Sequence, residues 1–315
     1  KGMSDADFPW TGIVFGAPIL GVWYWCTDQM IVQRTLAADN VKSARSATIF
    51  AGFLKILPVF ILVLPGRAGA VLFAGTPPNE MYATMVDKLL PVGVKGLVVA
   101  ALLAALMSSL SSVFNSSSTL AVMDFSHKFR PAASEKELVR AGQFATVVVV
   151  VIGVLWLPFI GKMSNQLYVY LQSVQAYISP PIAVVFLLGL LWRRLNGAGA
   201  LAALITGFVF GAFRFIAEIG VKVGWAWAND CPFTKAYATI NFLHFAVLLF
   251  LVSAAVFVVV SYLTRPPSEE KMKVFAVEAK ELAVDFGDKF NAGLSILLGA
   301  IIVALWIYFS PIFFK

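Results

Sequence analysis

The sequence predicts an all-α protein that crosses a lipid membrane several times. Sixty per cent of its 315 residues are apolar and 13% are charged, whereas a soluble domain averages about 45–50% and about 25%. The apolar residues gather into stretches long enough to cross a bilayer as helices, which takes about 20 residues. None of these stretches alternates with the period of two that an outer-membrane β-barrel requires. We therefore expect an integral membrane protein built of helices.

Eight stretches have the length and composition of a spanning helix. They cover residues 9–32, 46–64, 94–125, 142–160, 167–192, 198–219, 241–263 and 294–314. Two connections are longer than the rest. The first, 65–93, contains a candidate amphipathic helix at 79–90, and the second, 264–291, is a charged helical connector.

Lysine and arginine are concentrated in alternate loops, which predicts the orientation of the chain. The basic loops are 33–45, 126–141, 193–197 and 264–293, so we expect them on the cytoplasmic side, with residue 1 outside. The net charge of +7 includes no arginine-rich tract, and nucleic acid is not an expected partner. Cys26 and Cys231 are too few for a disulfide framework and lack metal-site spacing. The polar residues 1–10 are not typical of a signal peptide.

The first span combines helix-breaking residues with an aromatic run. Gly16, Pro18 and Gly21 precede the Trp-Tyr-Trp sequence at 23–25. Breaks in a spanning helix are tolerated where they line a cavity or where neighbours satisfy the freed backbone, and many transporters build a midplane site on them. The aromatic run is either an interface belt or a binding surface. Asp28 is either a partner for a cation or a cap on local backbone.

Two basic side chains lie within predicted spans. Lys55 is about nine residues from either end of the second span, where an ammonium costs at least about 2.5–3.5 kcal/mol to insert. It therefore needs a structural partner, such as a carboxylate or a helix end, or a water-filled cavity. Arg214 lies nearer the end of its span, and we expect its guanidinium to snorkel to the interface.

Small oxygen-bearing residues line one face of the third span, at steps of three and four. Such a stripe is either a seam for helix packing or a set of oxygen ligands, which hard cations such as Na⁺ prefer. The residues are Ala105, Ser108, Ser109, Ser112, Asn115, Ser116 and Thr119.

The fifth span contains one glutamine and a diproline. Pro180 and Pro181 lack backbone donors, so we expect a kink there. Gln172 lies about two turns earlier and can both donate and accept, as a ligand for a polyol must. The alternative for Gln172 is a hydrogen bond that holds two helices together.

Several motifs match those of one transporter family, in order over about residues 8–220. They are Trp-Tyr-Trp-Cys-Thr-Asp-Gln at 23–29, Gln-Arg-Thr-Leu-Ala-Ala at 33–38, Gly-Phe-Leu-Lys-Ile-Leu-Pro at 52–58, Leu-Met-Ser-Ser-Leu-Ser-Ser at 106–112, Phe-Asn-Ser at 114–116, Ala-Ser-Glu-Lys-Glu-Leu at 133–138, Tyr-Leu-Gln-Ser at 170–173 and Pro-Pro-Ile-Ala-Val-Val-Phe at 180–186. The chain thus resembles the solute:sodium symporter family, specifically its sodium/glucose cotransporter branch.

The resemblance implies a leucine-transporter-type fold of two inverted five-helix repeats with peripheral helices. Residues 1–192 resemble the second repeat, and residues 193–315 would be three peripheral helices with the connector 264–291. The first repeat would then be a missing partner of these residues, either removed by truncation or located elsewhere.

The resemblance also implies roles for particular residues. The family's sodium site falls on the carbonyl of Ala105 and the hydroxyls of Ser108 and Ser109, and Ser111 and Ser112 fall where some members build a second sodium site. Its sugar contacts fall on Lys55, Gln172 and Tyr24, the last as an aromatic gate, with Trp25 beside it. Gly21 departs from the family, which has an asparagine or threonine that touches a sugar hydroxyl there.

We therefore expect a sodium-coupled symporter for a sugar or inositol in an inner or plasma membrane, working by alternating access without covalent chemistry. One alternative is a sodium symporter for an amino acid, sialic acid or a vitamin. Another is a symporter-like nutrient sensor, and the last is a structural membrane subunit. Lys55 together with Gln172 favours a polyhydroxyl substrate, and a structural subunit would not need Lys55.

Overall fold

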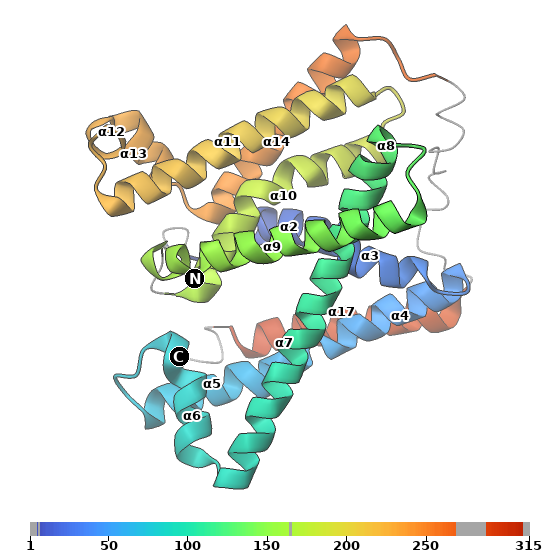
Figure 1. The fold of residues 1–315 in the computed structure, drawn as a ribbon. Helices are drawn as coiled ribbons and strands as arrows, with labels where there is room; N and C mark the ends of the chain where they lie inside the picture. Colours follow the sequence, from blue (N-terminus) through green and yellow to red (C-terminus); the bar gives the residue numbers. More distant parts are fainter. Residues whose placement is uncertain (1–4, 6, 164–165, 269–287, 311–315) are drawn as a thin grey trace. The chain divides into compact units, whose positions relative to one another are not determined.

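The computed structural model describes residues 5, 7–163, 166–268 and 288–310, and every regular element among them is a helix (Figure 1). This confirms the predicted all-α membrane fold. In this part of the chain, seven helical segments are long and apolar enough to cross a membrane. They are Val41–Leu72, Val92–Ser126, Glu135–Pro158, Leu167–Leu191, Gly197–Val223, Phe242–Leu263 and Lys289–Tyr308.

The chain divides into two compact units by the contacts within each. Unit 1 combines Lys1–Ser46 with Tyr168–Lys315, and unit 2 is Ala47–Leu167. The predicted division at residue 192, between a repeat and peripheral helices, stays a prediction.

Unit 1 begins with the interrupted helix that its glycines and proline predict. The first predicted span, 9–32, consists of α1 (Trp10–Phe15), α2 (Ala17–Cys26) and α3 (Gln29–Leu36). The interruption at Gly16 is slight, because its backbone remains in the helical region. The larger one is at Asp28, which has an extended backbone and accepts a hydrogen bond from the amide of Met30 (2.9 Å). Asp28 is therefore a helix N-cap, the second of the two roles considered for it.

The core of unit 1 lies among three long helices. They are α10 (Leu167–Leu191), α11 (Gly197–Val223) and α14 (Phe242–Leu263). Residues from α2, α10 and α14 share one buried apolar cluster, which includes Ile19, Tyr177 and Phe245. Two short helices, α12 (Ala226–Asp230) and α13 (Pro232–Thr239), connect α11 to α14.

Two glycines of α11 allow it to approach α10 at the diproline. A Cβ on Gly207 would collide with Pro181, and a Cβ on Gly211 would collide with the carbonyl oxygen of Tyr177. Close approach of backbones through small residues is the usual basis of helix packing in membranes. α10 itself continues as one helix through Pro180 and Pro181.

Two polar side chains in the connection between α10 and α11, Arg194 and Asn196, bind the C-terminal end of α14. Arg194 donates to the carbonyls of Ser261 (2.7 Å) and Thr264 (3.2 Å) at the end of α14. Asn196 caps α11 through the amide of Gly199 and also donates to Thr264 Oγ1 (2.6 Å). The bonds from Arg194 satisfy carbonyls that the end of α14 leaves without helical partners.

Unit 2 begins with a helix that is interrupted at a lysine. α4 (Val41–Leu54), which starts in unit 1, ends at a two-residue turn formed by Lys55 and Ile56, and a π-helical segment η1 (Val59–Val63) and α5 (Leu64–Leu72) follow. Pro58 lies between the turn and η1 and has no amide to continue the helical bonding. The sequence predicted this span as one stretch, 46–64, without the interruption.

The rest of unit 2 confirms the predicted amphipathic helix. After a 3₁₀ turn (Pro78–Glu80), α6 (Met81–Leu89) packs Met81 and Met85 on Gly69. On its polar side, a hydrogen bond from Lys95 (2.9 Å) holds the pKa of Asp87 below its usual range. α7 (Val92–Leu120) then continues through a π-helical segment, η3 (Ala121–Ser126), and the short α8 (His127–Phe129), and α9 (Glu135–Met163) completes the unit.

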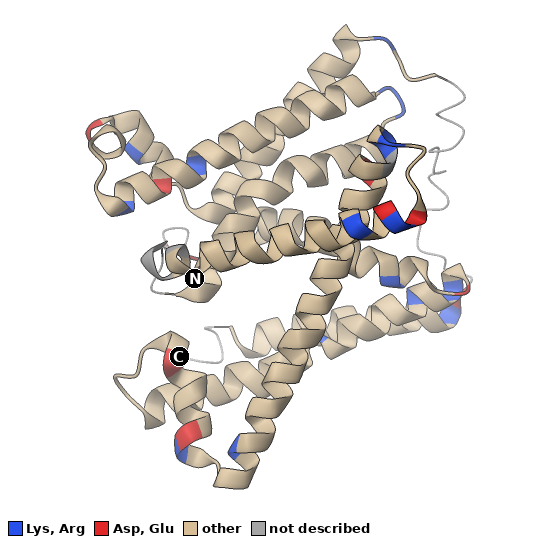
Figure 2. Cartoon of the chain, viewed as in Figure 1, with Lys and Arg blue, Asp and Glu red and all other residues tan. Residues whose placement is uncertain are grey.

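Charged residues in the spanning helices of unit 1 lie mainly toward their ends, as a bilayer requires (Figure 2). α10 and α14 contain no charged residue. The last described helix, α17 (Lys289–Tyr308), starts five residues before the predicted 294. The predicted end of this span, 314, and most of the connector 264–291 lie outside the described residues.

Candidate functional site

The aromatic run lies in the last turn of α2, directly before the interruption at Asp28. The rings of Tyr24 and Trp25 meet edge to face with centroids 5.4 Å apart, and those of Trp23 and Tyr24 are 6.4 Å apart. Trp25 is 42% exposed and Tyr24 is partly buried. The run therefore presents aromatic surface at a helix end, which suits stacking on an apolar face of a ligand.

Gly21 leaves a vacant position one turn before Tyr24. Residues three apart lie on the same side of a helix, and a Cβ built on Gly21 would meet nothing within 4 Å. The chain therefore has no side chain at the position where the resemblance predicts a polar contact with the sugar, and it has the room for one.

Gln172 lies in the first half of α10 and is partly buried. Its neighbour Ser173 is buried and donates to the carbonyl of Val169 (2.8 Å). The helix of Gln172 and that of Tyr24 and Trp25 both belong to unit 1. The two helices, α10 and α2, contribute to the same apolar cluster.

Lys55 lies in unit 2, in the turn that ends α4. Its backbone amide donates to the carbonyl of Ala51 (3.0 Å), and its side chain is exposed. The turn is thus a second helix interruption with a predicted substrate residue on it.

The serine stripe on α7 has members with different surroundings. Toward its C-terminal end Ser116 is 5% exposed and therefore packed, whereas Asn115 and Thr119 are exposed. Ser118, which lies outside the stripe, faces Gly142 of α9. Ala105, Ser108, Ser109 and Ser111 are exposed and Ser112 is partly buried, with its hydroxyl donating to the carbonyl of Ser108 (3.0 Å). Packing therefore accounts for Ser116, and ion binding by the exposed hydroxyls stays a prediction.

The predicted residues divide between the units. Unit 1 contains Tyr24, Trp25 and Gln172, and unit 2 contains Lys55 together with the serines of α7. The predicted sugar site and sodium site stay predictions, each supported within its unit by the helix interruption or the exposed hydroxyls described above.

The expectation for Arg214 is wrong. Its side chain is 3% exposed instead of extending to an interface. Nη1 lies 3.4 Å from Glu218 Oε2, and Nη2 donates to the carbonyl of Ile240 (2.9 Å). The guanidinium also lies over the ring of Tyr177, 5.2 Å from its centroid. A carboxylate one helical turn away removes the need to reach water, because it compensates the buried charge directly.

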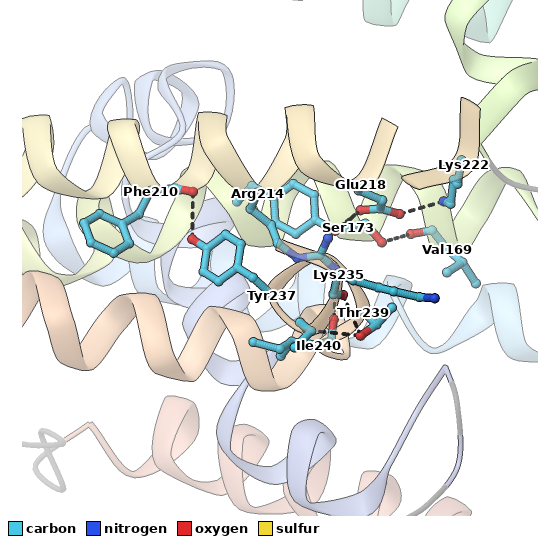
Figure 3. A network of polar contacts seen from close by, with 12 residues as sticks. Val169, Ser173, Phe210, Arg214, Glu218, Lys222, Lys235, Tyr237, Thr239 and Ile240 are labelled. Atoms are coloured by element: carbon cyan, nitrogen blue, oxygen red, sulfur yellow. Dashed lines mark hydrogen bonds and ion pairs between the residues drawn. The ribbon is translucent and has the colours of Figure 1, made fainter. Parts of the chain in front are cut away.

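Glu218 is the centre of this group, as Figure 3 shows for its neighbours on α11. The hydroxyl of Tyr177 on α10 donates to Glu218 Oε2, and Lys222 donates to Oε1 (2.6 Å). We call Tyr177, Arg214, Glu218 and Lys222 the Glu218 cluster. The sequence analysis missed it, although the spacing of Arg214, Glu218 and Lys222 by four residues is typical of ion pairs along a helix.

A second buried tyrosine lies beside the cluster. Tyr237 of α13 donates to the carbonyl of Phe210 on α11 (3.0 Å; Figure 3). Burial raises the pKa of Tyr237 to about 12, so its hydroxyl is protonated at neutral pH and remains a donor. This bond joins α13 to α11 without involving α10.

Comparison with known proteins gives consistent matches. Residues 1–207 match the model of the sodium:solute symporter family. Sodium/glucose cotransporter 1 of Mus musculus is 41% identical over 280 residues, which cover 82% of this chain and 42% of that protein. Sodium/myo-inositol cotransporter 2 of Homo sapiens is 40% identical over 285 residues (84% and 42%). Sodium/mannose cotransporter SLC5A10 of Bos taurus is 42% identical over 285 residues (83% and 47%). The chain therefore spans less than half the length of these relatives.

Proposed function

Because this chain belongs to the sodium:solute symporter family, as its motifs indicated, we propose that it is part of a sodium-coupled symporter for a sugar or inositol in an inner or plasma membrane. The observation that carries the proposal is the identity of about 40% with cotransporters named for glucose, myo-inositol and mannose. The family match over residues 1–207 also includes every proposed site residue, from Tyr24 to Gln172.

In this proposal Na⁺ binds on α7. Ser108 and Ser109 supply hydroxyl oxygens, and Ala105 supplies a carbonyl, whose second lone pair is available even inside a helix. Their exposure leaves these oxygens accessible to an ion. Ser111 and Ser112 are candidates for a second ion. Oxygen ligands without a fixed charge suit an ion that must bind and leave in each cycle.

The sugar binds where helices are interrupted. Tyr24 stacks on the C–H face of the ring, with Trp25 beside it, and Gln172 exchanges hydrogen bonds with ring hydroxyls. Lys55 donates to a further hydroxyl. Transporters with broken helices place their substrates near the middle of the membrane, and this supports a substrate role for residues at such interruptions.

Transport then follows by alternating access. Na⁺ bound at α7 and at a helix of the first repeat stabilises the outward-open form, the sugar binds, and movement of one helix bundle against the other exposes both inward. The chain described here would supply the second repeat and the peripheral helices, and the first repeat would supply the other half of each site.

Uptake of deoxy sugars by the transporter that contains this chain tests the substrate assignment. A site built to pair with hydroxyls rejects analogues that lack them, because its own polar groups are left unsatisfied. Gln172→Ala should therefore reduce the preference for one particular hydroxyl about three- to tenfold. Lys55→Ala should abolish sugar binding, and Tyr24→Phe should keep most of it whereas Tyr24→Ala should not. A Gln172→Ala transporter with an unchanged deoxy-sugar profile would move the assignment to a non-sugar solute.

A further inference from the structure

The part of α10 that contains Gln172 is weakly tied to the rest of its helix. Pro180 and Pro181 have no amide hydrogens, so the carbonyls of Ala176 and Tyr177 lose the partners that an α-helix normally gives them. Two consecutive lost bonds make this a point where a helix bends easily. The position of the N-terminal half of α10 therefore depends on its contacts with neighbouring helices.

The Glu218 cluster provides such a contact at the point where the bonds are lost. Tyr177 lies four positions before Pro181 and is 3% exposed. Its hydroxyl donates to Glu218 of α11. The carbonyl of Tyr177, which loses its helical partner at Pro181, lies against Gly211 of α11. Side chain and backbone of Tyr177 thus both rest on α11.

Glu218 is in turn fixed by its own partners. Lys222 binds Oε1, and Arg214 pairs with Oε2 while donating to the carbonyl of Ile240, just before α14. A hydrogen bond to an ionised group is stronger and shorter than one between neutral groups. The carboxylate therefore offers the hydroxyl of Tyr177 a fixed and strong acceptor.

Helix geometry relates this contact to Gln172. Tyr177 is five positions after Gln172, which places the two about 140° apart around the helix and about 7.5 Å apart along it. The face of Tyr177 is buried against α11 and α14, and Gln172 is on another, partly exposed face. A rotation of the N-terminal half of α10 about its axis would therefore change the direction in which Gln172 points.

We propose that Tyr177 and Glu218 are positioning residues that hold the N-terminal half of α10 so that Gln172 faces the substrate. The role of Gln172 in this statement rests on the proposed function. The positioning itself concerns only α10 and α11, and a measurement without substrate can detect it.

Reactivity of a cysteine at position 172 is that measurement. In the full transporter with Cys26→Ser, Cys231→Ser and serine at every cysteine outside this chain, Gln172→Cys is modified with a methanethiosulfonate reagent. Tyr177→Phe removes only the hydroxyl and keeps the ring next to Arg214, so the protein should fold. We expect it to change the modification rate at position 172 about threefold or more, because the bond lost is one to a charged group. The matched control, Tyr237→Phe, removes a buried hydroxyl bond that does not involve α10 and should leave the rate unchanged.

Transport kinetics give the second readout. With Gln172 present, Tyr177→Phe should raise the half-saturating sugar concentration several-fold with little change in maximal rate. With Gln172→Ala it should have no further effect on that concentration, because residues that act through one contact are not additive. An unchanged modification rate at position 172, or fully additive effects, overturns the proposal. If Gln172→Ala alone leaves the deoxy-sugar profile intact, the sugar assignment fails, and the modification rate still decides the positioning.

Discussion

At the scale of single residues, removal of one hydroxyl group distinguishes the two roles proposed for the serines of α7, ion binding and helix packing. Ser109 is exposed, whereas Ser118 of the same helix packs against Gly142 of α9. The two positions therefore form a natural pair, one expected to bind an ion and one that contributes to packing.

Ser109→Ala should raise the Na⁺ concentration needed for half-maximal uptake about three- to tenfold, as expected for the loss of one neutral ligand. The helix should remain intact, because alanine is a better helix former than serine. Since coupling is reciprocal, the affinity for sugar at a fixed low Na⁺ concentration should fall as well. Ser118→Ala is the control and should change neither. Identical Na⁺ dependence of the parent and Ser109→Ala would make the whole stripe a packing seam.

Gly21 allows the opposite kind of test, in which a group is added. The open space around its Cβ position means that Gly21→Asn should fold normally. The new amide would lie one turn before Tyr24 and could pair with a sugar hydroxyl, so the transporter's ranking of glucose, mannose and inositol should change by about tenfold for at least one pair, the value of one good hydrogen bond. Competition uptake measures the ranking, and Gly293→Asn on α17 is the control. An unaltered ranking would show that Gly21 lies away from the substrate.

At the scale of helices, the glycine contact between α10 and α11 should be sensitive to one methyl group. Gly211→Ala places a Cβ against the carbonyl of Tyr177 and should destabilise the protein by about 1–3 kcal/mol. Thermal unfolding in detergent measures this. Gly293→Ala, whose Cβ meets nothing within 4 Å, should be neutral or stabilising because alanine favours helix. Equal stabilities of the two variants would mean that α10 and α11 do not pack through Gly211.

Helix interruptions differ in how well the sequence predicts them. Glycine and proline in the first span correctly indicated a broken helix, although the larger interruption lies at Asp28, where an N-cap starts α3. The interruption at Lys55 was missed, although Pro58 is a visible signal for it. Arg214 was misjudged because it was not paired with Glu218 one turn later, although that spacing is typical of an ion pair. The bond from Tyr177 to Glu218 joins two helices and has no local sequence signal.

At the scale of the whole molecule, composition was sufficient to predict a membrane protein, because its apolar content exceeds what a soluble core can bury. The motifs were sufficient for the family, which the comparisons confirm. The complete binding sites, in contrast, could not be predicted from the sequence. Their residues come from helices far apart in the chain, and in our proposal half of each site comes from the first repeat, so no local pattern in residues 1–315 can specify a complete site.

The most direct test of the account is Na⁺-driven uptake of labelled sugar into proteoliposomes. The transporter that joins this chain to its proposed first repeat should take up sugar only with an inward Na⁺ gradient. Residues 1–315 alone should insert but show no such uptake, because a midplane site lies between two repeats. Na⁺-dependent uptake by residues 1–315 alone, or sugar uptake by the joined transporter that ignores Na⁺, would contradict the account.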